Sequence, residues 1–394
     1  MKKYIIGVGM GGETLTAAAE KAIKNVDVLI GAERMLKSFE FLGKIMVKSY
    51  DCTEICRFIA KFEGNSAAVL VSGDVGFFSL ASKLLQFSEF ADAELICGIS
   101  TPVYFCSKIN RSFEKMRMIS LHGNECGIAV NVRQNRNCFF LLGGNITAGE
   151  VCRRLTENGL GDVNVWIGEN FDCENELIRC GTAAKFVDVK CERLSAIITE
   201  NLENNNYYTD CISDDLFTRS DIPMTKAEVR CIALAKLNIK SDDVCWDIGC
   251  GSGSVTVGMA LKCHNGMVYA VDRSRKAVEL TKANCHKFSC DNVILRCGVF
   301  PEIQSFPKPD CVFVGGSGGR LKEILNAAYN ANSAVKIVVT AVSLETIAEA
   351  SNEMERLGMQ VEITQISVTR THKIGKNTMF DALNPIVIIR GEAR

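Results

Sequence analysis

"VCWDIGCGSGS", residues 244–254, is the stretch of this 394-residue chain that most strongly decides a fold. An apolar run ends at Asp247, and Gly249, Gly251 and Gly253 follow in a turn that leads into a helical pattern. Glycines let the backbone approach a ligand closely and adopt positive φ, and the start of a helix presents free amide groups. The stretch therefore predicts a strand, a ligand-binding turn and a helix.

The spacing of the glycines favours one class of ligand. The loop reads G-x-G-x-G, and Ser254 stands where the dinucleotide pattern counted from Gly249 requires glycine. Asp272 ends the next predicted strand, where a carboxylate can accept both hydroxyls of a ribose. S-adenosylmethionine, which has no pyrophosphate, therefore suits the loop better than a nicotinamide dinucleotide. A tight turn that binds nothing is the alternative reading.

The second half of the chain continues this alternation of strand and helix. An amphipathic helix is expected in residues 224–239, capped by Thr225, with Glu228 completing a capping box. Seven strands are predicted in this half. Helix-length segments separate the first five, and a short polar loop is expected between the last two. This order predicts a doubly wound sheet that ends in an antiparallel pair. The seven apolar runs are "VCWDIGCGSGS", "MVYAVDRS", "NVILRCGV", "PDCVFVGGSGG", "AVKIVVTAV", "QVEITQISV" and "NPIVIIRG".

The first half opens with a second glycine loop, "YIIGVGMGGETLT", residues 4–16. Its G-x-G-x-x-G is a weak dinucleotide match when taken alone. Apolar runs alternate with helical stretches and predict a mainly parallel α/β sheet, and a second set of runs from about residue 116 predicts a second lobe. The first set is "YIIGVG", "VDVLIG", "AAVLVSGD" and "AELICGIS", and the second is "MRMISLH", "NCFFLLGG", "NVWIGEN" and "LSAIITE".

These patterns divide the chain into two domains. Residues 1–200 form the first, with a break between its lobes near residues 106–116. Residues 201–217, rich in Asn and Asp and without apolar periodicity, are predicted to be a linker. Residues 218–394 form the second domain.

The composition limits the classes of function. Apolar residues make up 47% of the chain, charged residues 23%, and the net charge is −1, so no overall field attracts nucleic acid or an anionic membrane. No run approaches the roughly 18 apolar residues of a membrane span, and the start reads as a strand and turn rather than a signal peptide. Nineteen cysteines without a C-x-x-C pair, beside four histidines, are typical of small buried side chains and not of a metal site. We expect a cytoplasmic protein that binds no metal.

The loops also resemble those of known families. "GVGMGGETLT", "SGDVGFFS", "GISTPVYF" and "SLHG" resemble, in this order, the signature loops of the tetrapyrrole methylases, which have the class III methyltransferase fold. "DDLFTRSDIPMTKAEVRCIALAKL", "WDIGCGSGSVTV" and "VFVGGSGG" resemble the decarboxylating corrin methyltransferases, which have the Rossmann-like class I fold. The order of the two halves resembles that of the fused precorrin-6Y C5,15-methyltransferases of cobalamin biosynthesis.

The resemblance implies an S-adenosylmethionine site in each half. The corresponding residues are Gly73, Asp74, Ser100 and Thr101 in the first half, and Thr225, Gly249, Cys250, Gly251, Ser252, Gly253, Asp272 and Gly298 in the second. Substrate contacts are expected from Gly7, Gly9, Gly315 and Gly316, and from two cations one helical turn apart, Lys226 and Arg230. Further candidates for binding substrate carboxylates are Arg219, Arg320, Arg370, Lys373 and Lys376. No catalytic residue is singled out.

The implied reaction is methylation of reduced precorrin-6, or its cobalt form, at carbons 5 and 15, with decarboxylation of the acetate at carbon 12. A homo-oligomer is also expected by resemblance. Three alternatives stay open on the sequence. They are a methyltransferase that acts on another small molecule or nucleic acid, a non-catalytic module that senses S-adenosylmethionine, and a nicotinamide oxidoreductase. The absence of a basic, aromatic stripe disfavours nucleic acid.

Overall fold

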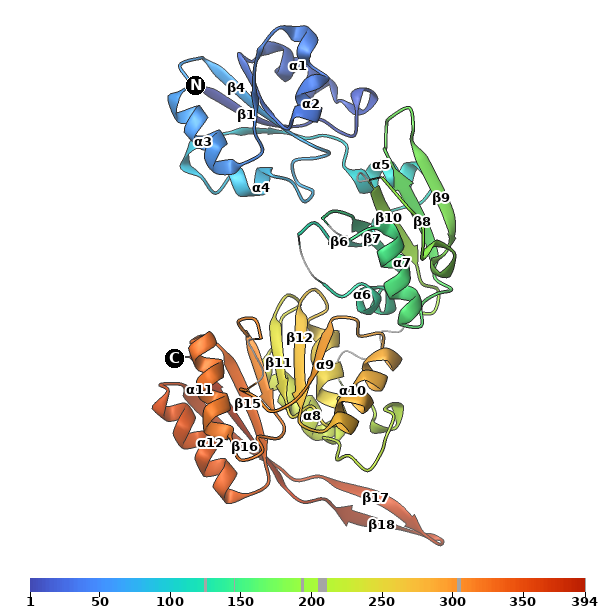
Figure 1. The fold of residues 1–394 in the computed structure, drawn as a ribbon, viewed down its shortest axis with the longest axis vertical. Coiled ribbons are helices and arrows are strands. Elements are labelled where there is room, and N and C mark those ends of the chain that lie inside the picture. Colours follow the sequence, from blue (N-terminus) through green and yellow to red (C-terminus); the bar gives the residue numbers. More distant parts are fainter. Residues whose placement is uncertain (124–125, 145, 193–194, 205–210, 303–305, 394) are drawn as a thin grey trace.

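The computed structural model describes the chain except residues 124–125, 145, 193–194, 205–210, 303–305 and 394. Residues 205–210 belong to the predicted linker, so that part of the prediction lies outside the described residues. The described residues form three sheets and a separate hairpin (Figure 1). This arrangement confirms the predicted α/β class.

The first sheet is parallel, in the order β3-β2-β4-β1-β5. Strand β1, which lies beside the central strand β4, has Ile5 and Ile6 fully buried, one in the core on each face of the sheet. Parallel strands aligned in this way end at one edge, so the loops after β1, β4 and β5 meet there. The strands are β1 (Lys2–Gly7), β2 (Val28–Gly31), β3 (Ile45–Lys48), β4 (Ser66–Val71) and β5 (Glu94–Ile96), and the helices are α1 (Ala17–Asn25), α2 (Glu33–Lys37), α3 (Cys52–Lys61) and α4 (Ala81–Leu84).

The second sheet has the order β6-β7-β10-β8-β9, in which only β6 and β7 are parallel neighbours. Helix α5 (Thr101–Lys108) leads from the first sheet toward it. Its strands are β6 (Arg117–Ser120), β7 (Asn137–Leu141), β8 (Asn164–Glu169), β9 (Leu177–Thr182) and β10 (Ser195–Glu200), with helices α6 (Ala129–Gln134) and α7 (Ala148–Glu157).

The third sheet has seven strands in the order β13-β12-β11-β14-β15-β19-β16. All seven predicted strands are present, and β19 runs antiparallel to both neighbours, as predicted. One core packs against α8, α9 and α10 and another against α11 and α12, so helices cover both faces (Figure 1). The strands are β11 (Val244–Ile248), β12 (Met267–Asp272), β13 (Val293–Cys297), β14 (Cys311–Val314), β15 (Lys336–Ala341), β16 (Gln360–Ile366) and β19 (Ile386–Glu392), and the helices are α8 (Ala227–Leu237), α9 (Ser254–Lys262), α10 (Arg275–Lys287), α11 (Leu321–Ala331) and α12 (Leu344–Arg356).

Two local predictions in this half are wrong. The segment between β16 and β19 is a hairpin of β17 (Thr369–Ile374) and β18 (Asn377–Ala382), not a polar loop, and it projects from the sheet (Figure 1). Its strands show little apolar pattern because β18 is exposed along its whole length. Helix α8 begins at Ala227 with Lys226 as its N-cap, so Thr225 does not cap it. The carboxylate of Glu228 instead binds Arg370.

A polar junction joins the second and third sheets. The Asp291 carboxylate accepts hydrogen bonds from the amides of Ile128 (3.0 Å) and Val130 (3.2 Å) and pairs with Arg154. Val130, from the first half, is fully buried in a core cluster otherwise built from residues between Ile212 and Ile388. The Gly127 amide donates to the His264 carbonyl (3.2 Å). The two halves are therefore docked through specific contacts rather than only tethered.

Most of the cysteines are the small buried side chains that the sequence predicts. All nineteen are free thiols, and eleven of them are buried. Burial raises the pKa of Cys138 and that of Cys285 to about 12, because a thiolate would lose its hydration there. These buried thiols therefore stay neutral and pack as small apolar groups.

Candidate functional sites

The loops after β1, β4 and β5 meet at one edge of the first sheet. Gly9 and Gly73 exchange two backbone hydrogen bonds of 3.1 and 2.8 Å. A Cβ on Gly7 would lie 2.7 Å from the Gly73 carbonyl oxygen and 2.8 Å from the Gly98 nitrogen. The glycine at position 7 is thus required by loop packing, and substrate contact by Gly7 stays a prediction.

The four predicted cofactor residues of the first half lie on two of these loops. The Asp74 carboxylate accepts from the Gly76 amide (2.8 Å) and the Gly98 amide (3.0 Å), which ties the loop after β4 to the loop after β5. Ser100 is buried at the start of α5, and Thr101 Oγ1 lies 3.5 Å from the sulfur of Met10. The structure brings these residues together, and cofactor binding by them remains a prediction.

A cavity of about 460 Å³ lies beside the first glycine loop. Gly9 lines it, as expected for a substrate contact, together with apolar side chains of α1 and α2. Among the polar lining residues that were not predicted are Arg34 after β2 and Asp172 from the second lobe. Asp172 Oδ2 accepts from Thr14 Oγ1 (3.1 Å), so both lobes contribute to this cavity. The position of Arg34 just after a strand was the available signal for it.

A second cavity of about 460 Å³ lies beneath the glycine loop of the second half. Several residues predicted to bind ligand line it, together with the apolar side chains of Val255, Phe313 and Ile366. The predicted residues that do not line it are Gly253, Asp272, Gly298, Gly316 and Arg230. Those that do are Thr225, Lys226, Gly249, Cys250, Gly251, Ser252 and Gly315.

The glycine loop has the tight backbone that the sequence predicts. Gly249 has φ +79°, and a Cβ there would lie 2.6–2.9 Å from backbone atoms of Gly316. Gly253 has φ +77° directly before α9. Asp272, at the end of β12, accepts from the Gly251 amide (3.0 Å) and the Ser274 amide (2.8 Å), and so holds the loop in place.

Asp247 is a second acid at this loop, which the sequence reasoning did not assign to the site. It is fully buried and lines the cavity. One carboxylate oxygen accepts from Thr256 Oγ1, and the other has no hydrogen-bond partner within the described residues. Burial raises the pKa of Asp247 to about 7. A buried, unpaired carboxylate oxygen beside a glycine cradle fits a ligand that carries positive charge.

Arg230 does not reach the cavity, so its predicted role as a substrate-binding cation is corrected. Its side chain is 2% exposed and pairs with Asp214 at 3.2 Å. The guanidinium also donates to the carbonyls of Thr225 (2.7 Å) and Ile212. Arg230 is one turn from Lys226, as the spacing requires, but on the inner face of α8. Lys226 lines the cavity and has no ion-pair partner among the described residues.

The other candidate cations also differ in their surroundings. Arg219 pairs with Asp215 at 3.3 Å, and Arg320 with Glu302 and Glu323 at 2.6 and 3.0 Å. Protein carboxylates therefore already pair with the two arginines that were expected to bind substrate carboxylates. Lys373 and Lys376 lie on the exposed hairpin.

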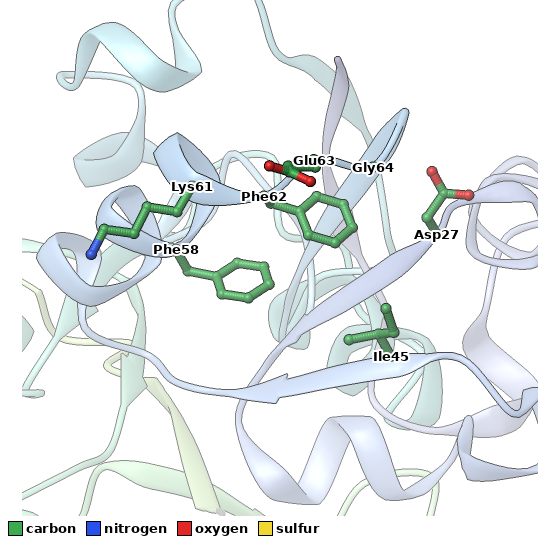
Figure 2. Close-up of a pocket in the computed structure, with 7 residues that line it drawn as sticks. All are labelled: Asp27, Ile45, Phe58, Lys61, Phe62, Glu63 and Gly64. Carbon is green, nitrogen blue, oxygen red and sulfur yellow. The ribbon is translucent and has the colours of Figure 1, made fainter.

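A third cavity, of about 510 Å³, lies at the opposite edge of the first sheet (Figure 2). Asp27 and Gly64 precede β2 and β4, and Ile45 begins β3, so the cavity is at the amino ends of these strands. The rings of Phe58 and Phe62 stack at 5.4 Å and face Ile45, while Lys61 points away. This third cavity is therefore separate from the glycine loops, which lie at the carboxyl ends of the strands.

Within the described part of the chain, no cluster of three or more His, Cys, Asp or Glu side chains could hold a metal ion. The same residues include no helix that is both long enough and apolar enough to cross a membrane.

Fold and sites together define a protein with two α/β halves, each with glycine-rich loops at the carboxyl ends of parallel strands. A family model described as tetrapyrrole (corrin/porphyrin) methylases matches residues 2–187. A model described as a precorrin methyltransferase domain matches residues 215–392. The two models therefore account for the two halves separately.

Curated relatives match about half of the chain. A probable cobalt-precorrin-6B C(15)-methyltransferase (decarboxylating) of Saccharolobus solfataricus is 42% identical over 194 residues, which are 48% of this chain and 98% of the relative. A protein of the same name from Pyrobaculum calidifontis is 44% identical over 191 residues, again 48% and 98%. The chain belongs to the precorrin methyltransferase family, which uses S-adenosylmethionine.

Solved structures that match about half of the chain were also found. A precorrin-6y C5,15-methyltransferase from Geobacter metallireducens is 37% identical, with a TM-score of 0.45, and is matched over 47% of this chain and all of that one. A precorrin-6Y methylase from Archaeoglobus fulgidus is 20% identical, with a TM-score of 0.41, over 51% of this chain and 98% of that one.

Proposed function

We propose that the chain is a bifunctional enzyme of cobalamin biosynthesis. It transfers methyl groups from S-adenosylmethionine to carbons 5 and 15 of a reduced precorrin-6 and removes carbon dioxide from the acetate at carbon 12. The observation that carries this proposal is the second-half cavity, where a glycine cradle and the unpaired carboxylate oxygen of Asp247 suit a cationic cofactor. The names of the curated relatives support the substrate class and the decarboxylation.

The residues present explain how the second half could serve methyl transfer. When bound, S-adenosylmethionine supplies an electrophilic methyl group. The protein holds two reactants together and keeps water away, and such positioning can lower a barrier by about 7–11 kcal/mol. Gly249 and Gly251 let the backbone approach the ligand, Asp247 offers negative charge, and the apolar walls exclude water. No strong base is needed because the ring carbon of the substrate is itself electron-rich.

Decarboxylation places different demands on the site. The electrons of the broken carbon–carbon bond pass into the conjugated macrocycle, which then takes up one proton in place of the lost carbon dioxide, so the substrate provides its own electron sink. The protein must orient the acetate and leave it poorly solvated. Lys226, on the cavity wall and without a carboxylate partner among the described residues, is placed to bind another substrate carboxylate and so fix the ring.

Mass spectrometry of the product tests the proposed reaction. The purified chain, incubated with S-adenosylmethionine and reduced precorrin-6, is expected to yield a product with two added methyl groups and one carbon dioxide lost. Running the cobalt-free and the cobalt form side by side identifies the preferred substrate. Unchanged mass with both forms, in protein that binds S-adenosylhomocysteine, would contradict the corrin assignment and leave a methyltransferase for another small molecule or a sensor.

The raised pKa of Asp247 predicts pH-dependent cofactor binding. Asp247 is mainly protonated below pH 7 and becomes charged as the pH rises through its pKa of about 7. A cationic ligand favours the charged form, so affinity for S-adenosylmethionine in the second-half site should rise from pH 5 to 7, by up to about tenfold per unit, and then level off. Calorimetry should show proton release on binding at pH 6.

Asp247→Asn provides the comparison for that experiment. The variant should bind S-adenosylmethionine more weakly at pH 8. Binding at its second-half site should no longer depend on pH or release a proton. The first-half site, which the substitution does not touch, is expected to bind as before. A wild-type affinity that is flat between pH 5 and 8 would exclude the proposed contact.

Two expectations from the sequence remain proposals. We propose that the chain acts in the cytoplasm and as a homo-oligomer. Light scattering of the purified protein measures its oligomeric state directly, and a mass of about 43.1 kDa would mean a monomer.

A further inference from the structure

The β17–β18 hairpin forms part of the second-half cavity although it stands apart from the sheet. Val368, just before β17, and Leu383 and Asn384, just after β18, line the cavity at the base of the hairpin. The Leu383 amide donates to the Val368 carbonyl (2.9 Å), so hairpin and cavity wall are continuous. A lone two-stranded hairpin is at best marginally stable in water. The position of this wall therefore depends on contacts at its base.

Arg370 provides such a contact. It lies on β17, two residues beyond Val368, and its guanidinium binds two carboxylates from outside the hairpin. Nε lies 3.0 Å from Glu228 Oε1 on α8, and Nη2 lies 3.1 Å from Asp214 Oδ2. The planar fork of arginine can join two acids in a fixed geometry, which a lysine cannot reproduce.

Asp214 connects this anchor to a second wall of the same cavity. It is 4% exposed, and its other oxygen pairs with Arg230 at 3.2 Å. Arg230 in turn donates to the carbonyl of Thr225, which lines the cavity (2.7 Å). One buried carboxylate thus joins two arginines, each of which holds one wall. Groups in a buried charge network keep a fixed geometry because an unpaired buried charge is costly.

We propose that Asp214 is a positioning residue that sets the distance between the Thr225 wall and the hairpin wall of the second-half cavity. It contacts neither wall directly and acts through Arg230 and Arg370. The inference rests on the proposed function only in taking this cavity as the S-adenosylmethionine site. It assigns a role to the segment before α8, and it explains why Arg370 is held at the cavity rim although it does not line the cavity.

Hydrogen–deuterium exchange of the full-length chain tests the proposal without substrate. In Asp214→Asn and in Arg370→Gln, amide exchange of residues 369–382 should quicken by about tenfold or more, the equivalent of about 1.4 kcal/mol. In Asp214→Asn, exchange of residues 222–226 should quicken as well. Arg370→Lys should fall between wild type and Arg370→Gln. The matched control is Asp215→Asn, the same change at a neighbouring carboxylate that is 91% exposed, and it should leave both segments unchanged.

Ligand binding and product analysis provide a second readout. S-adenosylhomocysteine should bind the second-half site at least about tenfold more weakly in Asp214→Asn, and KM for S-adenosylmethionine should rise more than kcat falls. At S-adenosylmethionine concentrations below the raised KM, the product should carry the methyl group added by the first half, mostly lack the one added by the second half and retain its carbon dioxide. The first half thus serves as a control within the same molecule.

The outcomes are separable. Unchanged exchange and unchanged affinity in folded Asp214→Asn and Arg370→Gln would overturn the proposal. If Asp214→Asn does not fold, Arg370→Gln decides, because that side chain is 38% exposed and its loss is tolerable to the core. If wild-type protein methylates no precorrin while the hairpin still loosens in the variants, the proposed function fails and the positioning role stands.

Discussion

Replacing Gly249 by alanine is expected to reduce strongly the methylation and the decarboxylation carried out by the second half, while methylation by the first half continues. A Cβ at this position would lie 2.6–2.9 Å from three backbone atoms of Gly316, and backbone cannot swing aside as a flexible side chain can. The backbone at φ +79° adds a cost of about 1–2 kcal/mol for any L-residue. Because the loops after β11 and β14 would have to separate, we expect a loss of at least about a hundredfold in kcat/KM, measured by mass spectrometry of the product.

Gly358→Ala is the matched control for this experiment. Gly358 lies in the same half at φ +81°, but a Cβ there meets nothing within 4 Å. It therefore bears the same backbone strain without the clash, and its effect should be limited to about 1–2 kcal/mol of stability. If both variants lose activity equally, strain rather than loop contact is responsible, and the proposed role of the Gly249–Gly316 approach would be wrong.

Replacing Asp291 by alanine is expected to uncouple the unfolding of the two halves. The side chain is 4% exposed, and its removal leaves Arg154 and two backbone amides at the junction without their partner. Breaking a buried ion pair from one side typically costs about 3–5 kcal/mol. The chain's two tryptophans, Trp166 and Trp246, lie in different halves. Urea unfolding of single-tryptophan variants can therefore follow each half separately.

In the chain with Asp291 intact the two fluorescence transitions should coincide, and in Asp291→Ala they should separate. Glu279→Ala serves as control, because that carboxylate belongs to an exposed pair with Arg275 on the neighbouring α10. Exposed pairs contribute about 0–1 kcal/mol, so this variant should shift both transitions little. Coincident transitions in Asp291→Ala would show that the junction does not depend on this carboxylate.

Buried, strongly patterned elements were predictable from the sequence. All seven strands of the third sheet appear. The inner strands β11, β12, β14 and β15 are mainly apolar and lie in a sheet covered on both faces, whereas the edge strand β16 is mostly exposed and alternates apolar with polar residues. The elements that were not predicted are mostly solvent-exposed. Strands β3, β9 and β18, which were not among the predicted strands, contain no buried residue that would impose an apolar period.

The site was predictable where backbone geometry dictates the residue. The glycines of the 249–253 loop and the approach of Gly9 to Gly73 follow from spacing at strand ends. Arg230 was misread because helical spacing places it one turn from Lys226 but does not reveal that Asp214, sixteen residues earlier, takes its charge. Asp247 was recognised as the end of a strand, but its unpaired oxygen depends on tertiary burial.

The docking of Val130 into the other half has a consequence for the integrity of the protein. A protease that cuts the chain between residues 200 and 212 would remove the covalent link but not the junction at Asp291. The two fragments should then co-migrate as a one-to-one complex under native conditions and part only in denaturant. Covalent continuity would serve chiefly to guarantee equal amounts of both activities at synthesis, while the junction maintains the pairing afterwards.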